Sequence, residues 1–470
     1  MENPPIKNYS FKHSFVKGEF FGLSWEGLER LVSAANVFLM LRILSLHEFG
    51  IYQLVLAFYS IVTTFSVDSI HEVVANDMNR FLNEKKLEQY RHLFSEYALL
   101  RVVLGAITAL VVFLFANLIG ARYGEAITSY IRVIALLFLL EGFRKPLFTV
   151  LKAHLYFGIS TGQALIVASV KLIGFIILIK LGSFNILTVV IVHVFGYTVS
   201  TAVMSWFFLV KLRHSFTWKV FGRSKVIWAI VRQHGKWAIA GEQISRFTQN
   251  IRPWLINYLL NPSAVAIFSL ALGLVGMLNS FLPLRTFSTL IPRELADKRR
   301  LHFIYRNSVK FVGLAGMAIA VVAFFVFPPV IKLILPKYAV SFPYFKLLLF
   351  VLLPLAGFSY LTRAILVALR EQKVLFTRPL LQFIPTVIFS FLLIPKLGLW
   401  GAAIEYTITF IFLAVVLYTY LARVVPELRL NFWELVSLNR DDWRFIQANS
   451  ASVWKEVTGK VFKKLEWRNS

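Results

Sequence analysis

The chain has 470 residues, of which 58% are hydrophobic and 45 are phenylalanine, while only 16% carry a charge. This composition, with a mean hydropathy of +0.68, excludes a soluble globular protein and indicates an integral membrane protein. The net charge of +26 would favour nucleic acid as a partner only if the basic residues formed one soluble surface, and here they lie between hydrophobic segments. The chain has no cysteine, which excludes disulfides, thiolate metal sites and cysteine nucleophiles.

Twelve segments are long and apolar enough to cross about 30 Å of hydrocarbon, which takes roughly 20 helical residues. The first six predicted spans are Phe20–Leu44, Gly50–Val74, Ala98–Ile119, Ile127–Phe143, Tyr156–Ile179 and Phe184–Val210. The second six are Trp237–Leu260, Ala264–Leu284, Phe311–Ile331, Leu347–Val367, Leu375–Ile394 and Leu399–Leu421. The sequence therefore predicts an all-α polytopic membrane protein with six spans in each half.

The basic residues are distributed unevenly between the two sides of these spans. Most of the 50 lysines and arginines lie in the N-terminal arm, in the connections after even-numbered spans and in the C-terminal tail. Basic connections resist translocation and stay in the cytoplasm. We therefore expect both termini to be cytoplasmic and the chain to lie in the cytoplasmic (inner) membrane.

The two halves are related by an offset of 216 residues. Glu26 and Arg30 in the first half correspond to Glu242 and Arg246 in the second, and Lys180-Leu181-Gly182 corresponds to Lys396-Leu397-Gly398. An even number of spans in each half brings both halves into the membrane in the same sense, so the repeat is parallel. We expect two six-helix bundles around a central polar cavity.

This organisation predicts three domains. Residues 1–212 form an N-terminal bundle with a cytoplasmic arm, residues 213–424 form the second bundle, and residues 425–470 form a basic cytoplasmic tail. In the tail, apolar residues recur at helical spacing; they are Trp454, Val457, Val461 and Leu465. The tail is either an amphipathic helix at the membrane interface or a solvated segment.

Basic residues inside spans are the first candidates for a binding site, because an intramembrane charge is costly and needs a partner or water. Arg30 and Arg246 each lie about 15 Å into a span by helical rise, close to the midplane. They either line the cavity or pair with the glutamate four residues earlier. Arg252 precedes Pro253, which is expected to kink its helix. The sequence predicts that Arg30, Arg246 and Arg252 bind an anionic ligand.

Lys171 is a further deep cation and a further candidate ligand. It either contacts the substrate or pairs with a buried carboxylate such as Glu141 or Glu405.

Deep carboxylates are candidates for lining the cavity or for coupling transport to a cation or proton. They are Glu26, Glu242, Asp68 and Glu72. Asp68 and Glu72 lie near the inner end of their span, where a structural or gating role is the favoured interpretation.

Motifs for covalent chemistry are missing from the sequence. It contains no Gly-x-x-x-x-Gly-Lys-Ser/Thr phosphate loop, no His-Glu-x-x-His helix and no Gly-x-Ser-x-Gly turn. The external connections are too short for a catalytic domain. We therefore expect a transporter with no catalytic residues, no metal site and no cofactor. A membrane-embedded glycan-processing enzyme is the alternative from another class.

Three segments resemble polysaccharide-transporter flippases of the multidrug/oligosaccharidyl-lipid/polysaccharide (MOP) exporter superfamily. They are Leu41–Tyr52 at the junction of the first two spans, Leu335–Tyr344 after the ninth, and Leu393–Ala403 before the twelfth. The resemblance implies a flippase with alternating access. Its substrate would be an O-antigen, capsule or exopolysaccharide repeat unit linked to polyprenyl pyrophosphate. It also implies membrane lipids and a glycan polymerase or other assembly proteins as partners.

The resemblance matches Arg30 and Arg246 to the cavity-facing cations of such flippases, and Glu26 and Glu242 depart from that pattern. A drug/cation antiporter of the same superfamily is the closest alternative. A cavity for cationic drugs would be acidic, so the deep arginines favour a flippase.

Overall fold

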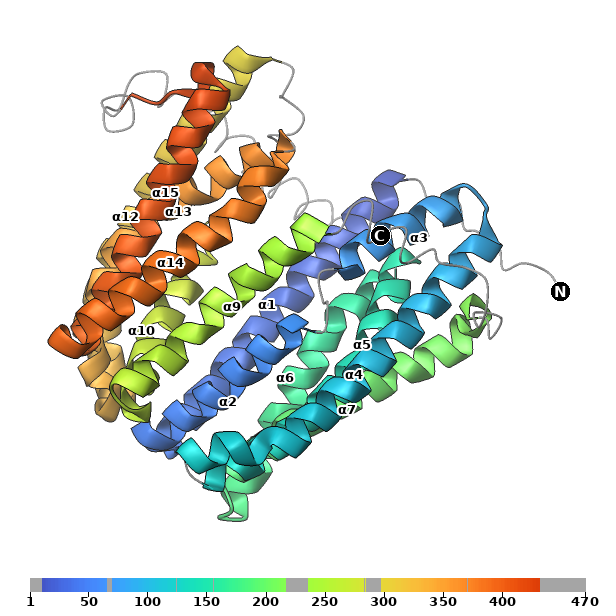
Figure 1. The fold of residues 1–470 in the computed structure, drawn as a ribbon, viewed down its shortest axis with the longest axis horizontal. Coiled ribbons are helices and arrows are strands. Elements are labelled where there is room, and N and C mark those ends of the chain that lie inside the picture. Colours follow the sequence, from blue (N-terminus) through green and yellow to red (C-terminus); the bar gives the residue numbers. More distant parts are fainter. Residues whose placement is uncertain are drawn as a thin grey trace, which may run out of the picture. The chain divides into compact units, whose positions relative to one another are not determined.

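The computed structural model describes residues 11–65, 70–123, 125–154, 156–216, 236–282, 284, 297–369 and 371–431. Within these ranges the chain is helical apart from short connections, and no strand occurs. The α-helices, labelled in Figure 1, are α1 (Phe11–Ile43), α2 (Leu46–Phe65), α3 (Ile70–Asn83), α4 (Leu87–Tyr123), α5 (Glu125–Ala153), α6 (Phe157–Lys180), α7 (Ile186–Lys211), α9 (Lys236–Leu259), α10 (Pro262–Asn279), α12 (Lys298–Ile334), α13 (Phe342–Ala368), α14 (Gln372–Leu397) and α15 (Leu399–Val424). Short 3₁₀ turns are η1 (Arg213–Ser215), η4 (Pro336–Ser341) and η5 (Pro426–Leu428).

Within the described residues the twelve predicted spans fall largely on helices, which confirms the all-α fold class. Eight helices of the described ranges are long and apolar enough by themselves to cross a membrane. The predicted span Gly50–Val74 falls on two helices, α2, which is described to Phe65, and α3, which is described from Ile70; residues 66–69 between them lie outside the described residues. The apolar side of α3 packs into a buried cluster through Val74 and Met78, and its other side is polar.

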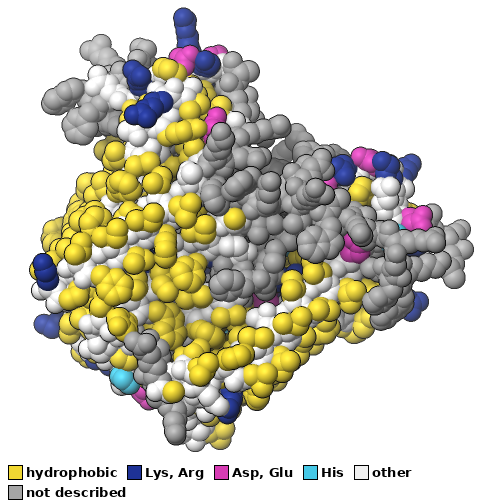
Figure 2. Space-filling view, viewed as in Figure 1, with side chains coloured by type: hydrophobic (Ala, Val, Ile, Leu, Met, Phe, Trp, Pro, Cys, Tyr) yellow, Lys and Arg dark blue, Asp and Glu magenta, His cyan; other side chains and the backbone are white. Residues whose placement is uncertain are grey.

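The helices expose large apolar side chains, as a membrane protein does. On α4, Ile107, Leu114 and Leu118 are 53%, 62% and 69% exposed. Their spacing places them along one side of the helix, where lipid can cover them. Figure 2 shows that hydrophobic side chains cover much of the described part of this face.

The 216-residue repeat is visible in the structure as well as in the sequence. The offset carries the end of α1 at Ile43 onto the end of α9 at Leu259. It also superposes Gly182, which follows α6, on Gly398, which follows α14. Both glycines have positive φ values, 65° for Gly182 and 58° for Gly398. Helix α1 packs against α6, and α9 packs against α14. Equivalent helices therefore make equivalent contacts.

Two compact units divide the chain. Unit 1 contains the described parts of Met1–Gly273, Phe327–Phe345 and Gln372–Thr409, and unit 2 contains those of Leu274–Val326, Lys346–Glu371 and Phe410–Ser470. The division at residues 212 and 424 stays a prediction. All contacts described below for the site lie within unit 1.

Two glycines allow α4 and α5 to approach closely. A Cβ atom at Gly142 would lie 2.8 Å from the carbonyl oxygen of Arg101, and one at Gly105 would lie 2.6 Å from that of Phe138. Any larger residue would push the helices apart. This contact fixes the position of Arg101 on α4 beside Glu141, the neighbour of Gly142 on α5.

A second close contact lies on the predicted external side. A Cβ atom at Gly50, near the start of α2, would lie 1.8 Å from the carbonyl oxygen of Pro262, the first residue of α10. Beside it, Lys337 in η4 donates to the carbonyl oxygen of Arg42 at 3.0 Å and to that of Leu44. The ammonium group thus caps the carboxyl end of α1. Unit 1 is tightly packed at this end.

Residues 217–235, between the halves, and the predicted basic tail after residue 431 lie outside the described residues.

Candidate functional site

A cavity of about 370 Å³ lies within unit 1 among α2, α4, α5, α7 and α9. Four basic residues and one acidic residue are among its lining, which gives a formal excess of positive charge. The lining residues are Tyr59, Ser60, Thr63, Arg101, Glu141, Arg144, Lys145, Tyr197, Arg246 and Asn250. Because several helices bring these charges together, the cavity is suited to an anionic ligand.

Helix α5 supplies three charged residues of the wall. Arg144 and Lys145 follow Glu141 by three and four residues, so the three side chains share one side of the helix. Pro146 follows at once and has no backbone N–H to complete the helical ladder. The hydroxyl of Thr149 donates to the carbonyl oxygen of Lys145 at 2.9 Å. The helix continues past the proline to Ala153.

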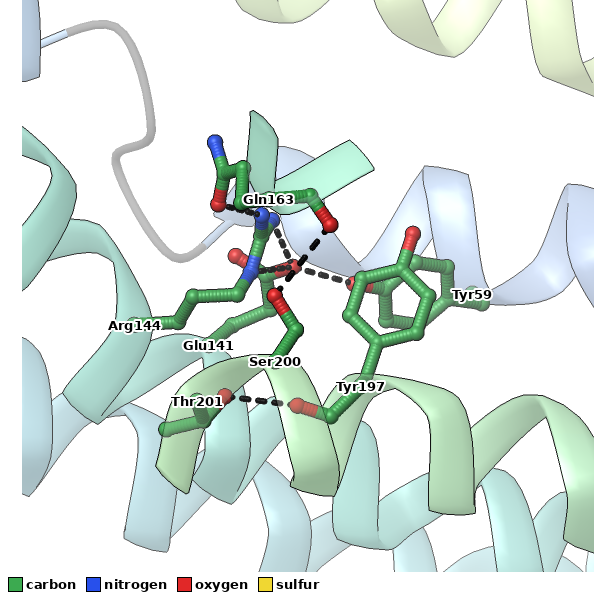
Figure 3. Close-up of polar contacts among 7 residues, drawn as sticks. All are labelled: Tyr59, Glu141, Arg144, Gln163, Tyr197, Ser200 and Thr201. Carbon is green, nitrogen blue, oxygen red and sulfur yellow. Dashed lines mark hydrogen bonds and ion pairs between the residues drawn. The ribbon is translucent and has the colours of Figure 1, made fainter. Parts of the chain in front are cut away.

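Glu141 and Arg144 form an ion pair that uses only one carboxylate oxygen, Oε1. Arg144 donates to it from Nε at 3.1 Å and from Nη2, and the hydroxyl of Tyr59 donates to it at 3.0 Å. Arg144 Nη1 donates to Oε1 of Gln163 at 2.7 Å. Figure 3 shows these four side chains converging from α2, α5 and α6.

The second oxygen of Glu141, Oε2, is buried and has no hydrogen-bond partner. The side chain as a whole is 8% exposed. A buried carboxylate oxygen without a partner costs free energy, more than a neutral acceptor does. The Glu141–Arg144 pair is therefore incompletely satisfied.

Tyr197 on α7 connects this pair to a buried histidine. The guanidinium carbon of Arg144 lies 5.1 Å from the centre of the Tyr197 ring. His193, one turn earlier on α7, stacks on the same tyrosine with ring centres 5.2 Å apart. Nδ1 of His193 lies 3.2 Å from the hydroxyl of Tyr52. Tyr197 is thus held by aromatic and cation–π contacts.

A second arginine–glutamate pair lies deeper in unit 1 and is complete. Arg252 on α9 forms a fork with Glu405 on α15, with Nε–Oε2 at 2.9 Å and Nη2–Oε1 at 3.1 Å. Nη2 also donates to Thr386 on α14, and Thr409 donates to Glu405 Oε1 at 3.2 Å. The Tyr406 ring covers the guanidinium at 4.4 Å. The side chains of Arg252 and Glu405 are 5% and 0% exposed.

The predicted basic residues have different environments. Arg246 lines the cavity, and its carbonyl oxygen accepts from Asn250 Nδ2 at 2.7 Å. Arg30 is exposed on α1. The two carboxylates that the sequence offered to Lys171 pair elsewhere, Glu141 with Arg144 and Glu405 with Arg252. Lys171 packs its stem near Gly196 on α7.

The structure does not describe the side chains of the four predicted acidic residues. Asp68 lies outside the described residues, as do the side chains of Glu26, Glu242 and Glu72, whose backbones belong to helices. Among the residues that the structure does describe, no group of three histidine, aspartate or glutamate side chains is arranged to hold a metal ion.

Three cavity residues were missed in the sequence because they were assigned to span edges. Arg101 lies three residues inside a predicted span, and Arg144 and Lys145 follow one that was ended at Phe143. Helices α4 and α5 instead run on past these positions. The sequence signal was the Glu141–Arg144 spacing of three residues, which places both side chains on one side of a helix.

The helices define a class of protein, a multi-pass membrane protein whose fold is that of solved MOP superfamily transporters. A multidrug-resistance MATE family transporter of that superfamily, in an inward-facing conformation, superposes with a TM-score of 0.74 and 14% identity, over 85% of this chain and 94% of that chain. The chain belongs to the polysaccharide biosynthesis protein family, whose model matches residues 39–343. This confirms the resemblance to polysaccharide transporters.

Two further solved structures share the fold. The lipid II flippase MurJ in an inward closed conformation has a TM-score of 0.70 and 11% identity, covering 94% of this chain and 98% of that chain. A MOP superfamily transporter from Pyrococcus furiosus, described by the reverse polarity of its binding pocket, has a TM-score of 0.62 and 14% identity, covering 89% and 97%. No protein of curated function matches the sequence.

Proposed function

We propose that this transporter is a flippase for an oligosaccharide linked to polyprenyl pyrophosphate, which it moves from the inner to the outer leaflet by alternating access. The observation that carries the proposal is the cationic cavity inside the helical bundle. Pyrophosphate needs a cationic site away from bulk water. Membership in a polysaccharide biosynthesis family supports a glycan as the group that the pyrophosphate carries.

The depth of the cavity supports loading from the cytoplasmic leaflet. Tyr59 lies about 20 Å along α2 from Leu46, and Arg144 lies about 28 Å along α5 from Glu125. Both distances start at helix ends that the charge distribution assigns to the outside. In a hydrocarbon core about 30 Å thick, the cavity falls in the inner half.

The tight packing at the opposite end supports the same direction. Gly50 contacts the backbone of Pro262, and Lys337 caps α1. A ligand in the cavity would meet this packing on the external side. Substrate would then enter from the cytoplasm and leave only after the external contacts separate, which is the alternation that a flippase requires.

We assign the pyrophosphate to Arg246, Lys145 and Arg101, which line the cavity from three helices. Arg30 is retained as a candidate contact along the lipid path, since its side chain is exposed on α1. Lys171 is retained as a further candidate ligand. Arg252 is reassigned to a structural role, because its donors are engaged by Glu405 and Thr386. Glu26, Glu242, Asp68 and Glu72 are retained as coupling candidates.

The remaining parts of the proposal follow from the same function. The protein lies in the inner membrane with cytoplasmic termini, works with a glycan polymerase and other assembly proteins, and carries out no covalent chemistry. A drug/cation antiporter is the alternative, because a multidrug transporter shares the fold. The excess positive charge in the cavity opposes it, since cationic drugs would be repelled.

The test uses the purified full-length protein in detergent and in liposomes. Arg246→Gln and Lys145→Gln should each weaken binding of a polyprenyl pyrophosphate about ten- to a hundredfold, because each removes a charge-assisted hydrogen bond of about 1.5–3 kcal/mol. The same variants should reduce translocation of a fluorescent lipid-linked oligosaccharide. Arg132→Gln removes an arginine that is exposed on α5 and serves as the control. Binding of cationic drugs in place of the pyrophosphate would overturn the proposal.

A further inference from the structure

The geometry of the Glu141–Arg144 pair leaves each residue able to exchange its present hydrogen-bond partner for another. In the Arg252–Glu405 pair each carboxylate oxygen accepts from one guanidinium nitrogen. At Glu141, Nε and Nη2 of Arg144 and the hydroxyl of Tyr59 all donate to Oε1. Oε2 has no hydrogen-bond partner. Three donors compete for one oxygen while the other is unused.

A phosphate group would be a better partner for Arg144 than Glu141 is. Phosphate offers several oxygens in the spacing that a guanidinium fork matches with two parallel bonds. Arg144 also keeps its Tyr197 and Gln163 contacts, which hold the side chain at the cavity wall. A small rotation of the guanidinium would therefore exchange one acceptor for another without unfolding the site.

We propose that Arg144 is a latent ligand of the substrate phosphate, held by Glu141 while the cavity is empty and transferred to the phosphate when substrate binds. This inference rests on the proposed function and deepens it. Glu141 acts as a competitor that occupies Arg144 in the empty transporter. Glu141 also lowers the positive charge of the empty cavity, which would otherwise bind small anions without selectivity.

The exchange sets a selectivity for the substrate. Inorganic phosphate and other small anions must displace Glu141 with a single anionic group. A pyrophosphate can engage Arg144 through one phosphate and the neighbouring cations through the other. Glu141 thus raises the threshold for binding and favours the ligand with two linked phosphates.

The test measures binding of farnesyl pyrophosphate and of inorganic phosphate to purified full-length protein by calorimetry. Glu141→Gln removes the competitor, so it should bind farnesyl pyrophosphate about tenfold tighter than the parent. The gain for inorganic phosphate should be at least as large, because selectivity is lost. Glu141→Asp keeps the charge on a shorter side chain and should give a smaller gain.

Two controls separate this exchange from a general effect of charge. Glu84→Gln removes a unit charge from the connection between α3 and α4, outside the cavity. The hydrogen bond from Lys86 lowers the pKa of Glu84, so this glutamate is ionised at neutral pH. Glu84→Gln should leave the binding of both ligands unchanged. Adding Arg144→Lys to Glu141→Gln keeps the cation but removes the fork, and should abolish most of the gain.

Each outcome decides one of the two proposals. If the parent binds farnesyl pyrophosphate and neither Glu141 variant gains affinity, the exchange is wrong and the flippase proposal stands. If the gain survives Arg144→Lys, the effect is one of charge and the exchange is again wrong. If neither the parent nor any variant binds the pyrophosphate, both proposals fail. Size-exclusion profiles and melting temperatures confirm that folded protein is compared, and Glu141→Asp replaces a Glu141→Gln protein that does not fold.

Discussion

Two arginine–glutamate pairs lie in unit 1, and they differ in what surrounds them. Arg252 and Glu405 join α9 to α15 in a buried interior, where Thr386 and Thr409 add hydrogen bonds and the Tyr406 ring covers the guanidinium. Glu141 and Arg144 join two turns of α5 at the wall of a cavity, and one carboxylate oxygen has no hydrogen-bond partner.

The difference shows that an intramembrane charge is not by itself a functional site. A buried pair costs several kcal/mol per ion in desolvation, which only a complete set of partners offsets. A fully satisfied pair has nothing to offer a ligand, so its role is to hold helices together. An incomplete pair beside a cavity can gain from a ligand. Unused hydrogen-bonding capacity, more than charge, separates the two.

The largest expected difference between the two pairs is access from water. The natural chain has no cysteine, so single cysteines can be introduced without background. Ser60→Cys, at the cavity wall, should react with a membrane-impermeant thiol reagent in inside-out vesicles, whereas Thr386→Cys should not. An anionic reagent should react faster at Ser60 than a cationic one. Reaction of Ser60→Cys from the outside of intact cells alone would overturn the orientation, and equal reaction at Thr386 would remove the contrast.

The next effect is on stability. Arg252→Gln or Glu405→Gln leaves a buried charge without its partner and should destabilise the protein by about 3–5 kcal/mol. Replacing both with leucine should recover most of the loss, because no unpaired charge remains. Melting in detergent measures this. Glu141→Gln should lower the melting temperature less, since water can reach the cavity. A single Arg252 variant as stable as the parent would contradict the structural role.

Lysine at each arginine position should separate the pairs further. Arg252→Lys loses the fork to Glu405 and the bond to Thr386, so it should cost about 2 kcal/mol of stability. Arg144→Lys should cost less, because Glu141 uses a single oxygen that a point-charge ammonium can still contact. Equal losses at both positions would mean that the one-oxygen geometry of Glu141 has no energetic consequence. Melting temperatures of the two variants provide the measurement.

The smallest effect concerns the hydroxyl donors to each carboxylate. Thr409→Val removes one bond to Glu405 and should cost about 1 kcal/mol, the typical worth of a buried hydrogen bond. Tyr59→Phe removes the matching bond to Glu141 and should cost roughly half of that, because a cavity water can replace it. A larger loss at Tyr59 would show that water does not reach Glu141, and the comparison would need revision.

The fold was largely predictable because hydrophobic length is a strong signal in membranes. Twelve spans and the 216-residue offset were read from apolar windows and a few matching residues. Apolar length does not specify which helices pack together: Val74 and Met78 of α3 join a buried cluster with residues of α4 and α5, a contact that no local pattern predicts.

The site was predictable only in part, for a different physical reason. Arg246 was found because it lies deep in one span. Arg144 and Lys145 were missed because hydropathy windows end where charges begin, although the helix continues. The pairing of Arg252 with Glu405 joins residues 153 positions apart, and nothing local in the sequence specifies such a partner. Charge predicts that a residue needs a partner, and packing decides which one it has.

The contact at Gly50 has a consequence for the balance between conformations. With both helix ends in place, even an alanine at position 50 would overlap Pro262, because its Cβ atom would lie 1.8 Å from the Pro262 carbonyl oxygen. The cost falls on the arrangement described above, in which the start of α2 touches the start of α10. Since about 1.4 kcal/mol changes a population ratio tenfold, alanine and valine at this position form a graded series. Under the proposed alternating access, they should enrich the outward-open form by sequence alone, without an inhibitor or an antibody.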